Sequence, residues 1–560
     1  MKRPMPLSTV VATGKVQLKG ILRRADIRAA ALGVAAFATS IIIAVCAAGI
    51  AVIAAPSDSE DSIGIFRLFP DDTGFIQSAA SDVKVTTVTG TVVPVPNAPL
   101  NGSNKFFDVR LGATGQSCAT CHQPDQGFSI QVADIRRRFV ESGGTDPLFH
   151  FRNTANNPAV GAPNAKNYSV LLLLGATRIA KRYAPESNFT IAAANQRTIN
   201  EFGVFPLTND PEMELFPGGS AGNPTISAFR RPIVPTNLHE ESAVLFDGAV
   251  NIENILGQVT GGTMLLAGRA PTVDEAKEVG AFEFGVYTDQ VFDREAALPN
   301  GAGRLSAKGA KGGVENLSEF SLGPTVPCNV PALANVAQAS NLSGAGTCVP
   351  NVPGFDIFDA WANLPNAGNA ARLSVARGQE IFNNKELHVP PDLQAQLGRT
   401  TTNCKGCHSK HNVGNNVDRA FFVRLGTDSI AMLKDLIRGG GICATDTSPH
   451  PELREMLERV RLLPLYRVTA KAGSLAAGCG VSDAGDIITT DPGRAMVSGD
   501  IADAGKFRPT ILRNLAVRSP YFHAGVANDI GALIDFYNAR FSIGLTNQEK
   551  LDLAAFLESL

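Results

Sequence analysis

The chain has 560 residues, of which 44% are hydrophobic and 18% are charged, and this composition is typical of a packed globular protein rather than a disordered one. The formal net charge is −2. Residues 1–55 contain seven basic side chains and one acidic side chain, so the remainder of the chain is mildly acidic. This balance argues against nucleic acid as the main partner.

The N-terminus has the pattern of a targeting segment. Residues 29–55 form an uncharged run that is preceded by Arg23, Arg24 and Arg28 and followed by acidic residues from Asp58 onward. An apolar run of this length can cross a bilayer, and basic residues before it hold that end in the cytoplasm. The sequence therefore predicts that residues 1–55 are a signal peptide or an N-terminal membrane anchor. The rest of the chain is expected in the periplasm, either free or anchored to the inner membrane.

The most informative pattern is C-x-x-C-H, which occurs twice: Cys118, Cys121 and His122, and again Cys404, Cys407 and His408. This is the attachment signature of haem c. Two thiols on one turn of chain can add across the two vinyl groups of a haem, and the following histidine is then held under the iron. A zinc site would need four ligands, and a redox dithiol has no use for the histidine. The sequence predicts two covalently bound haem c groups, with His122 and His408 as iron ligands.

Four further cysteines, which lie in Gly/Pro-rich segments, are even in number: Cys328, Cys348, Cys443 and Cys479. An exported protein permits disulfide bonds. The local pairings are Cys328–Cys348 and Cys443–Cys479, although four cysteines allow three connectivities and free buried thiols are the alternative.

Helical patterns are clearest after residue 370. Residues 371–385 have apolar side chains at helical spacing. Thr546 and Glu549 form a capping box that starts a final helix, whose apolar face is expected at Leu551, Ala554 and Leu557.

The region between the two motifs is less regular. Residues 56–100 predict a strand or two followed by a linker, residues 168–176 a buried strand or helix, and residues 301–313 a flexible loop. We expect a mainly α protein with long loops and some β structure in the middle. The predicted domains are 56–370, which carries the first haem and the insertions, and 371–560, which carries the second haem.

The motifs and their surroundings resemble the diheme cytochrome c peroxidase and MauG-like family. The similarity lies in FFDVRLGATGQSCATCHQPDQGFS around the first motif, in Arg513 and Asn514, in the aromatic-His-x-Gly element 521–525, and in the final helix. It covers residues 105–130 and 371–560 well and the middle only loosely. The chain therefore resembles a longer branch with an enlarged middle region. The resemblance implies two cytochrome c-like haem domains.

The resemblance also implies different roles for the two haems: peroxide chemistry at the first and electron entry at the second. In the family, the distal ligand of the second haem is a Met, or a Tyr fourteen residues after the aromatic-His element. Counting from His523 gives Tyr537 as the predicted ligand. The alternatives are that Tyr537 only packs near the haem, or that Met496 is the ligand.

The distal side of the first haem is expected to be open. Peroxidase members often have a histidine sixteen residues after the proximal one, and here that residue is Arg138. The next histidine, His150, is expected to be a loop or core residue. An open iron face can bind peroxide or dioxygen.

Peroxide cleavage also needs an acid–base residue on the open side. The family's P-x-x-N-x-x-E-M pattern implies that this residue is Glu212. The family's Trp-Asp-Gly-Arg element normally precedes that glutamate, whereas its nearest match, 246–249, follows it. One of these two matches is a coincidence. At the position of the family's inter-haem tryptophan this chain has Phe246, and its single tryptophan, Trp361, is expected in a core.

The sequence therefore predicts an exported diheme peroxidase-like oxidoreductase. Hydrogen peroxide is the expected substrate, and a small donor protein or a quinol-linked donor is the expected partner. Three alternatives remain open: a diheme electron carrier without catalysis, a MauG-like oxidant of a protein partner, and a dioxygenase similar to rubber oxygenases. A carrier should have two six-coordinate irons that do not react with peroxide.

Overall fold

The computed structural model describes residues 66–70, 74–80, 84–86, 92–94, 104–112, 114–159, 164–182, 186–206, 224–236, 238, 241, 243–251, 254–293, 355–366, 368–408, 422–439, 441, 443–473, 475 and 478–560. Residues 60–560 belong to one compact unit. No helix in the described ranges is long and apolar enough to cross a membrane. The predicted targeting segment, Cys328, Cys348 and residues 301–313 lie outside these ranges.

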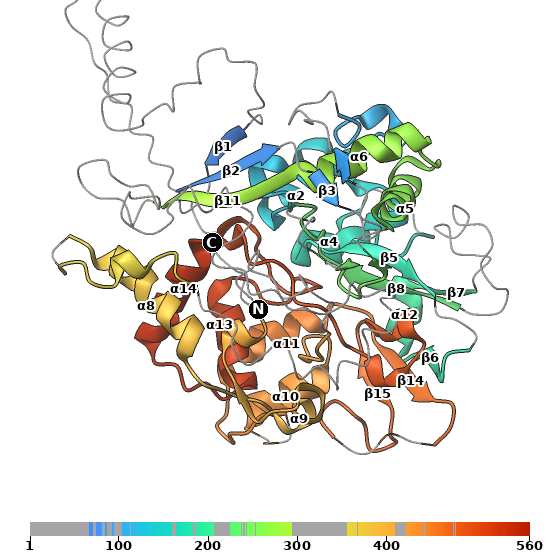
Figure 1. Ribbon diagram of the computed structural model, residues 1–560. Helices are drawn as coiled ribbons and strands as arrows, with labels where there is room; N and C mark the ends of the chain where they lie inside the picture. Colours follow the sequence, from blue (N-terminus) through green and yellow to red (C-terminus); the bar gives the residue numbers. More distant parts are fainter. Residues whose placement is uncertain are drawn as a thin grey trace, which may run out of the picture. The chain divides into compact units, whose positions relative to one another are not determined.

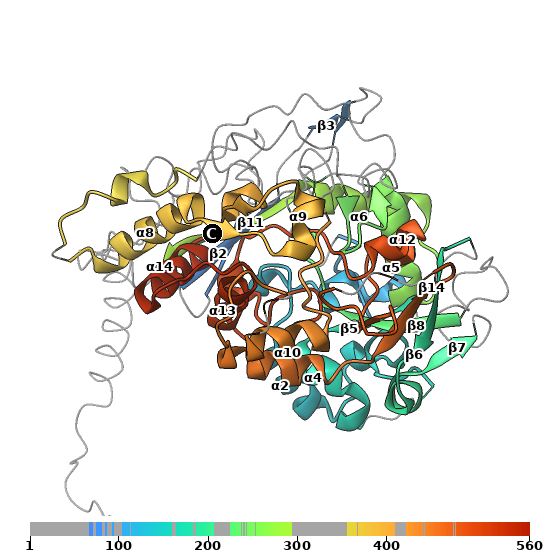
Figure 2. The same ribbon diagram turned by 90° about the horizontal axis from the view of Figure 1, so that it is seen from below.

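The helices gather mostly in the C-terminal part of the chain, where α8 and α14 lie side by side in both views (Figures 1 and 2). The longer helices of the chain are α2 (Val132–Ser142), α5 (Ile255–Ala267), α6 (Val273–Gly285), α8 (Ala370–Asn384), α10 (Ile430–Arg438), α13 (Ile530–Arg540) and α14 (Asn547–Glu558). Short helices are α3 (Phe151–Thr154), α4 (Ser169–Leu174), α9 (Pro391–Leu397), α11 (Arg454–Val460) and α12 (Ala495–Ser498). For residues 168–176 the sequence predicts either a strand or a helix, and the structure has the short helix α4 there.

The pairing of α8 with α14 corrects the predicted apolar face of the last helix. The capping box is confirmed, because Thr546 and Glu549 bond each other's backbone N–H groups. However, Leu551 is 63% exposed, and the buried apolar residues of α14 are Leu553, Phe556 and Leu557. The cause is a close helix contact: a Cβ on Gly378 would lie 1.9 Å from the carbonyl oxygen of Asp552. The helix therefore faces α8 through the Asp552 side, and Leu551 points away.

Three small antiparallel sheets have three strands each. Their strand orders are β1 (Phe66–Pro70), β2 (Gly74–Ala80), β11 (Val286–Asp293); β5 (Thr177–Lys181), β8 (Pro224–Arg230), β7 (Val204–Pro206); and β15 (Ile487–Thr489), β14 (Tyr466–Ala470), β6 (Phe189–Ala193). Two-stranded pairs are formed by β3 (Lys84–Thr86) with β4 (Val92–Pro94), β9 (Ala243–Val244) with β10 (Val250–Asn251), and β12 (Leu387–His388) with β13 (Thr401–Thr402). The strands expected within residues 56–100 are thus present.

One of these sheets joins the two predicted haem domains. Strand β6 pairs with β14 in the register Tyr466↔Ala193 to Ala470↔Phe189, and the two strands lie together in Figure 1. Segments on both sides of residue 370 therefore contribute to one hydrophobic cluster. Whether each haem segment folds independently stays a prediction.

Two smaller predictions are confirmed. Cys443 and Cys479 form a disulfide bond, and both are buried. Trp361 is a core residue, 2% exposed, which packs on Phe358 and under the guanidinium of Arg372.

Candidate functional site

The two C-x-x-C-H motifs adopt the same backbone turn. The first cysteine of each starts a single 3-10 turn, Cys118–Thr120 in one case and Cys404–Gly406 in the other. The carbonyl oxygen of this cysteine accepts the N–H of the motif histidine, at 3.0 Å from His122 and 2.9 Å from His408. The turn therefore brings two thiols and one imidazole to the same side of the chain, which is what thioether attachment requires.

The surroundings of the two turns also match. Each turn begins at an extended polar residue: Ser117 N–H donates to the hydroxyl of Thr120, and the side chain of Asn403 accepts from the N–H of Gly406. A buried phenylalanine lies beside each histidine, with ring centroids 6.3 Å apart and planes inclined at 52° in both the Phe106–His122 and the Phe382–His408 pair. This likeness was not visible in the sequence, because the two phenylalanines precede their histidines by different intervals.

Both histidines are neutral imidazoles at physiological pH, the form that binds a metal ion. Burial lowers the pKa of His122 and of His408 to about 4. The Nδ1 of His122 lies 3.1 Å from the carbonyl oxygen of Phe128, so a proton on Nδ1 leaves Nε2 free as a ligand. Among the described residues, none forms a hydrogen bond with Nδ1 of His408, and residues 409–421 are not described.

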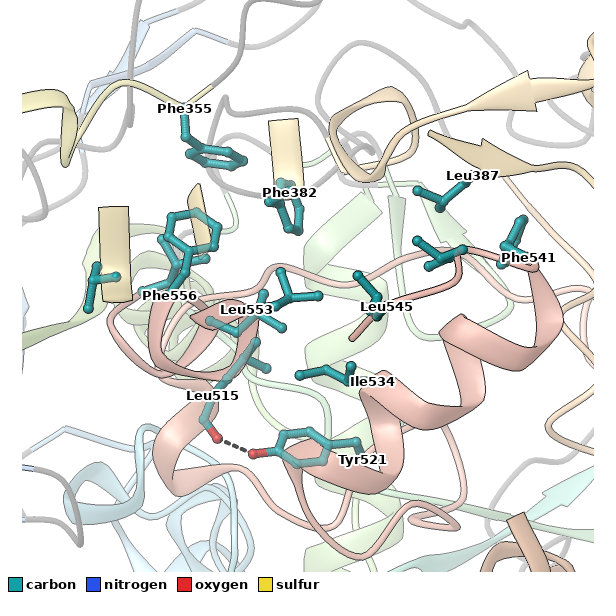
Figure 3. Packing of buried hydrophobic residues seen from close by; sticks show 14 of the residues in the cluster. Phe355, Phe382, Leu387, Leu515, Tyr521, Ile534, Phe541, Leu545, Leu553 and Phe556 are labelled. Atoms are coloured by element: carbon teal, nitrogen blue, oxygen red, sulfur yellow. Dashed lines mark hydrogen bonds between the residues drawn. The ribbon is translucent and has the colours of Figure 1, made fainter. Parts of the chain in front are cut away.

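His408 opens onto a cavity of about 1590 Å³, counted with its mouth, which we call the C-terminal cavity. Its walls are mainly the apolar cluster in Figure 3, including Phe382, Leu387, Ile534 and Phe541. Cys404 and Cys407 lie in the same wall. A mainly apolar lining beside two thiols and an imidazole fits a porphyrin bound through thioethers.

Tyr537, the predicted distal ligand, lies in the wall of the same cavity as His408. It comes from α13, and its ring stacks on Phe541 at 6.0 Å between centroids. Its hydroxyl makes no hydrogen bond to any residue in the described ranges, and burial raises its pKa above the usual range. Met496 instead packs with Phe189 and Ile191 in a separate cluster and does not line this cavity.

His122 opens onto a second cavity of about 1300 Å³, also counted with its mouth, which we call the N-terminal cavity. Cys118 and Cys121 lie beside it, and α5 forms much of one wall. Of its described lining residues, none besides His122 is a histidine, methionine or tyrosine. The open iron face expected from the sequence stays a prediction.

Neither Arg138, which stands where the family often has a distal histidine, nor His150, the next histidine, lines this cavity. Arg138 donates to the carbonyl oxygen of Thr120 at 3.0 Å and pairs with Asp146 at 2.6 Å, so it braces the cysteine-bearing turn. His150 starts the short helix α3. Glu212 lies outside the described residues, so its predicted role is not tested.

A different carboxyl group, Glu283 on α6, lines the N-terminal cavity. It is 5% exposed, and its Oε2 has no hydrogen-bond partner within the described part of the chain. Burial raises its pKa to about 8. Gln258 on α5 lines the same cavity and also has an unpartnered side-chain oxygen. Sequence reasoning missed both residues, since nothing in AFEFG marks the glutamate as buried.

Five residues line both cavities and form what we call the shared wall: Arg231, Pro232, Ile233, Phe246 and Arg508. Phe246, which occupies the position expected for the family's inter-haem tryptophan, is therefore in contact with both chambers. The aromatic contacts continue on the C-terminal side, where Phe246 packs edge-on against His523 and His523 stacks on Phe507 at 3.9 Å.

A buried ion network holds the strand behind the shared wall. Arg230, 2% exposed, bonds Asp491 at 2.6 Å and Asp247 at 2.7 Å, and Lys181 bonds Asp247 at 2.8 Å. Burial would raise the pKa of Asp247, but Arg230 and Lys181 outweigh it and hold this pKa well below the usual range. The network fixes Arg230, and with it the adjacent wall residue Arg231.

Parts of the chain are similar to curated cytochrome-c peroxidases. Cytochrome-c peroxidase IdrP2 of Denitromonas iodatirespirans is 38% identical over 78 residues, which are 13% of this chain and 21% of that protein. Cytochrome-c peroxidase IdrP1 of the same organism is 30% identical over 122 residues, 20% of this chain and 30% of that protein. For IdrP2 of Pseudomonas sp. (strain SCT) the identity is 28% over 129 residues, 22% of this chain and 32% of that protein.

The chain thus matches less than a third of the length of these relatives. No protein-family model matches it.

Proposed function

We propose that this chain is an exported diheme c-type cytochrome that reduces hydrogen peroxide, with electrons entering at the C-terminal haem and peroxide binding at the N-terminal haem. The observation that carries this proposal is the pair of equivalent C-x-x-C-H turns, each on its own cavity, with one shared wall between the cavities. The similarity to cytochrome-c peroxidases supports the peroxidase class. When bound, the haem irons supply the redox chemistry.

The residues of the C-terminal cavity suit electron entry. His408 and Tyr537 lie in the wall of one apolar chamber, and both side chains would hold the iron of a haem bound there. With both residues bound to it, a haem in this mainly apolar cavity would supply electron exchange rather than substrate binding.

The residues of the N-terminal cavity suit peroxide binding. His122 supplies a ligand, and the described lining offers no second histidine, methionine or tyrosine. At neutral pH Glu283 holds a proton, which it can pass to an oxygen of bound peroxide. Gln258, on the neighbouring helix α5, can orient that oxygen through its amide.

The disulfide bond between Cys443 and Cys479 supports export, because structural disulfides persist in oxidising compartments. A small donor protein or a quinol-linked donor outside the cytosol would then supply the electrons.

The test is a spectrum of the purified holoprotein before and after mixing with peroxide, together with electron spin resonance. We expect one high-spin iron that changes spectrum within the mixing time and one low-spin iron that does not. Two low-spin signals without a peroxide response would instead make the protein an electron carrier. His122→Gly should abolish turnover while the second haem stays attached; retained turnover would mean that the two roles are reversed.

A MauG-like oxidation of a protein partner is the second candidate, and Tyr537 is the observation that favours it. An oxygen ligand stabilises ferric and higher oxidation states of iron. The same peroxide experiment separates the two functions, because a MauG-like protein should keep the oxidising equivalents over both haems when no reductant is present.

A further inference from the structure

The C-terminal cavity has an unbalanced positive charge. Its described lining contains three arginines, Arg231, Arg508 and Arg518, and no aspartate or glutamate. Arg508 is balanced outside the cavity by an ion pair with Glu241. Arg231 and Arg518 therefore line an apolar chamber without a carboxylate partner among the described residues.

Arg231 is the more deeply buried of the two, at 5% exposure. Its guanidinium donates to the carbonyl oxygens of Gly175 at 3.2 Å and of Arg518 and Ser519 at 3.3 Å, and to the hydroxyl of Ser129 at 3.2 Å. All these acceptors are neutral. Burial lowers the pKa of Arg231 to about 9, and nearby Arg518 adds to the effect. A buried cation without a counter-charge is costly, because no opposite charge offsets its loss of hydration.

Arg518 has the same kind of environment. It donates to the carbonyl oxygens of Ile511 at 2.6 Å and Arg513 at 3.0 Å, and it forms no ion pair within the described ranges. Burial lowers its pKa to about 10.

The position of the Arg231 side chain is fixed by close contacts with two glycines and by a backbone hydrogen bond. A Cβ on Gly175 would lie 2.0 Å from Nη1 of Arg231, and a Cβ on Gly525 would lie 3.2 Å from its Cδ. The backbone N–H of Arg231 donates to the carbonyl oxygen of His523 at 2.6 Å. Two glycines and one backbone bond therefore fix where the guanidinium sits in the shared wall.

We propose that Arg231 and Arg518 are the counter-charges for the two propionate groups of the haem held at His408, and that Arg231 raises the reduction potential of that haem. The inference rests on the proposed haem, and the charge count carries it: two uncompensated cations face one cavity, and haem has two carboxylates. Guanidinium groups bind carboxylates through paired, charge-assisted hydrogen bonds. A cation beside the porphyrin favours the ferrous form, which carries one positive charge fewer.

The N-terminal cavity differs in this respect. In its described lining, Lys181 and Arg230 pair with the carboxylates of Asp247 and Asp491, and Arg508 pairs with Glu241. Arg178 donates to the hydroxyl of Ser227 and to the carbonyl oxygen of Arg152, and Arg231 belongs to the shared wall. Arg518 lines the C-terminal cavity but not the N-terminal one, so Arg231 and Arg518 come together only in the C-terminal cavity.

The test is a spectroelectrochemical titration of the holoprotein without peroxide. Arg231→Gln should lower the midpoint potential of the low-spin haem by at least about 59 mV. For a one-electron couple this corresponds to a tenfold lower ratio of reduced to oxidised haem at a given potential. Arg231→Lys, which keeps the charge, should retain most of the potential. An unchanged potential in Arg231→Gln, or an equal fall in both variants, would overturn the proposal.

A matched pair of glycine variants tests whether the position of the Arg231 guanidinium affects the potential, without replacing the arginine itself. Gly175 and Gly143 both have left-handed backbone, at φ +62° and +61°, but nothing lies within 4 Å of a Cβ on Gly143. Gly175→Ala should lower the potential and Gly143→Ala should not. If Arg231→Gln does not fold, Gly175→Ala and Arg518→Gln carry the test, and unchanged potentials in both would overturn it.

The outcome is separable from the peroxidase assignment. A holoprotein that ignores peroxide but shows the predicted shift would refute the peroxidase function and keep the propionate site. A protein that turns over peroxide with unshifted potentials would do the reverse.

Discussion

Phe246 and His523 pack edge to face, with ring centroids 6.3 Å apart and ring planes inclined at 71°. Phe246 lines both cavities, whereas His523 lines only the C-terminal one. The pair is therefore the aromatic contact that reaches from one predicted haem chamber to the other. Burial lowers the pKa of His523 to about 4, so its ring is neutral at physiological pH.

We expect Phe246→Leu to slow electron transfer between the haems, because it removes the ring and keeps an apolar side chain. The expected slowing is about tenfold or more, which is about 1.4 kcal/mol on the barrier. Stopped-flow spectroscopy of the half-reduced protein measures this rate. Phe422→Leu is the control, since Phe422 lies under Arg494 and lines neither cavity. Equal rates in the two variants would exclude Phe246 from the path.

Tyr537→Phe should change the low-spin electron spin resonance signal, because the phenol oxygen is the expected iron ligand. Tyr521→Phe is a matched control: it removes a hydroxyl from the same cavity, but that hydroxyl donates to the carbonyl oxygen of Leu515 at 2.6 Å (Figure 3). The control should leave the signal unchanged and cost about 1–2 kcal/mol of unfolding free energy. A Tyr537→Phe protein with the wild-type signal would show that the tyrosine only packs near the haem.

Glu283→Gln should lower kcat/KM for peroxide by about 10²–10⁴-fold, the usual contribution of a positioned acid–base group. Haem attachment should be unaffected. Asp274→Asn is the control, because Asp274 is an exposed carboxylate on the same helix. Loss of activity in both variants, or in neither, would remove Glu283 from the mechanism.

Glu283 should also make stability depend on pH. Its pKa is about 8 in the folded protein, above the ordinary carboxyl value, so the folded state holds this proton more tightly than the unfolded chain. Its stabilising contribution is complete below the ordinary carboxyl pKa and is lost as the pH rises toward 8. Denaturant unfolding across this window should show that decline in the wild type and a flatter profile in Glu283→Gln.

Removing the disulfide bond should destabilise the C-terminal region. Cys443 and Cys479 are 36 residues apart in sequence, and opening a loop of that length costs about 2–5 kcal/mol. The paired substitution Cys443→Ser with Cys479→Ser should lower the denaturant midpoint, as should reduction of the wild type. An unchanged midpoint would mean that the surrounding packing fixes this loop unaided.

The sequence was informative where chemistry depends on local spacing. The two C-x-x-C-H turns and the Thr546 capping box were predictable from near neighbours in the chain. The Cys443–Cys479 pair, 36 residues apart, was one of three connectivities that the sequence left open. Counting from His523 also reached Tyr537, which the structure places in the cavity of His408.

The features that the sequence did not predict depend on contacts between distant segments. Glu283 is unusual because it is a buried carboxyl group: α6 places it beside a cavity whose cysteines lie more than 160 residues earlier in the chain. Arg231 becomes unusual only when its neighbours prove to be carbonyl oxygens rather than carboxylates. The face of α14 was misplaced because the close approach of Gly378 to Asp552 decided its rotation.

Covalent attachment of two haems is checked by the intact mass of the mature, denatured holoprotein. We expect the mass of the polypeptide plus two haem groups. We also expect the loss of one haem in Cys118→Ser with Cys121→Ser, and of the other in Cys404→Ser with Cys407→Ser. A mature protein with one haem or none would contradict the account.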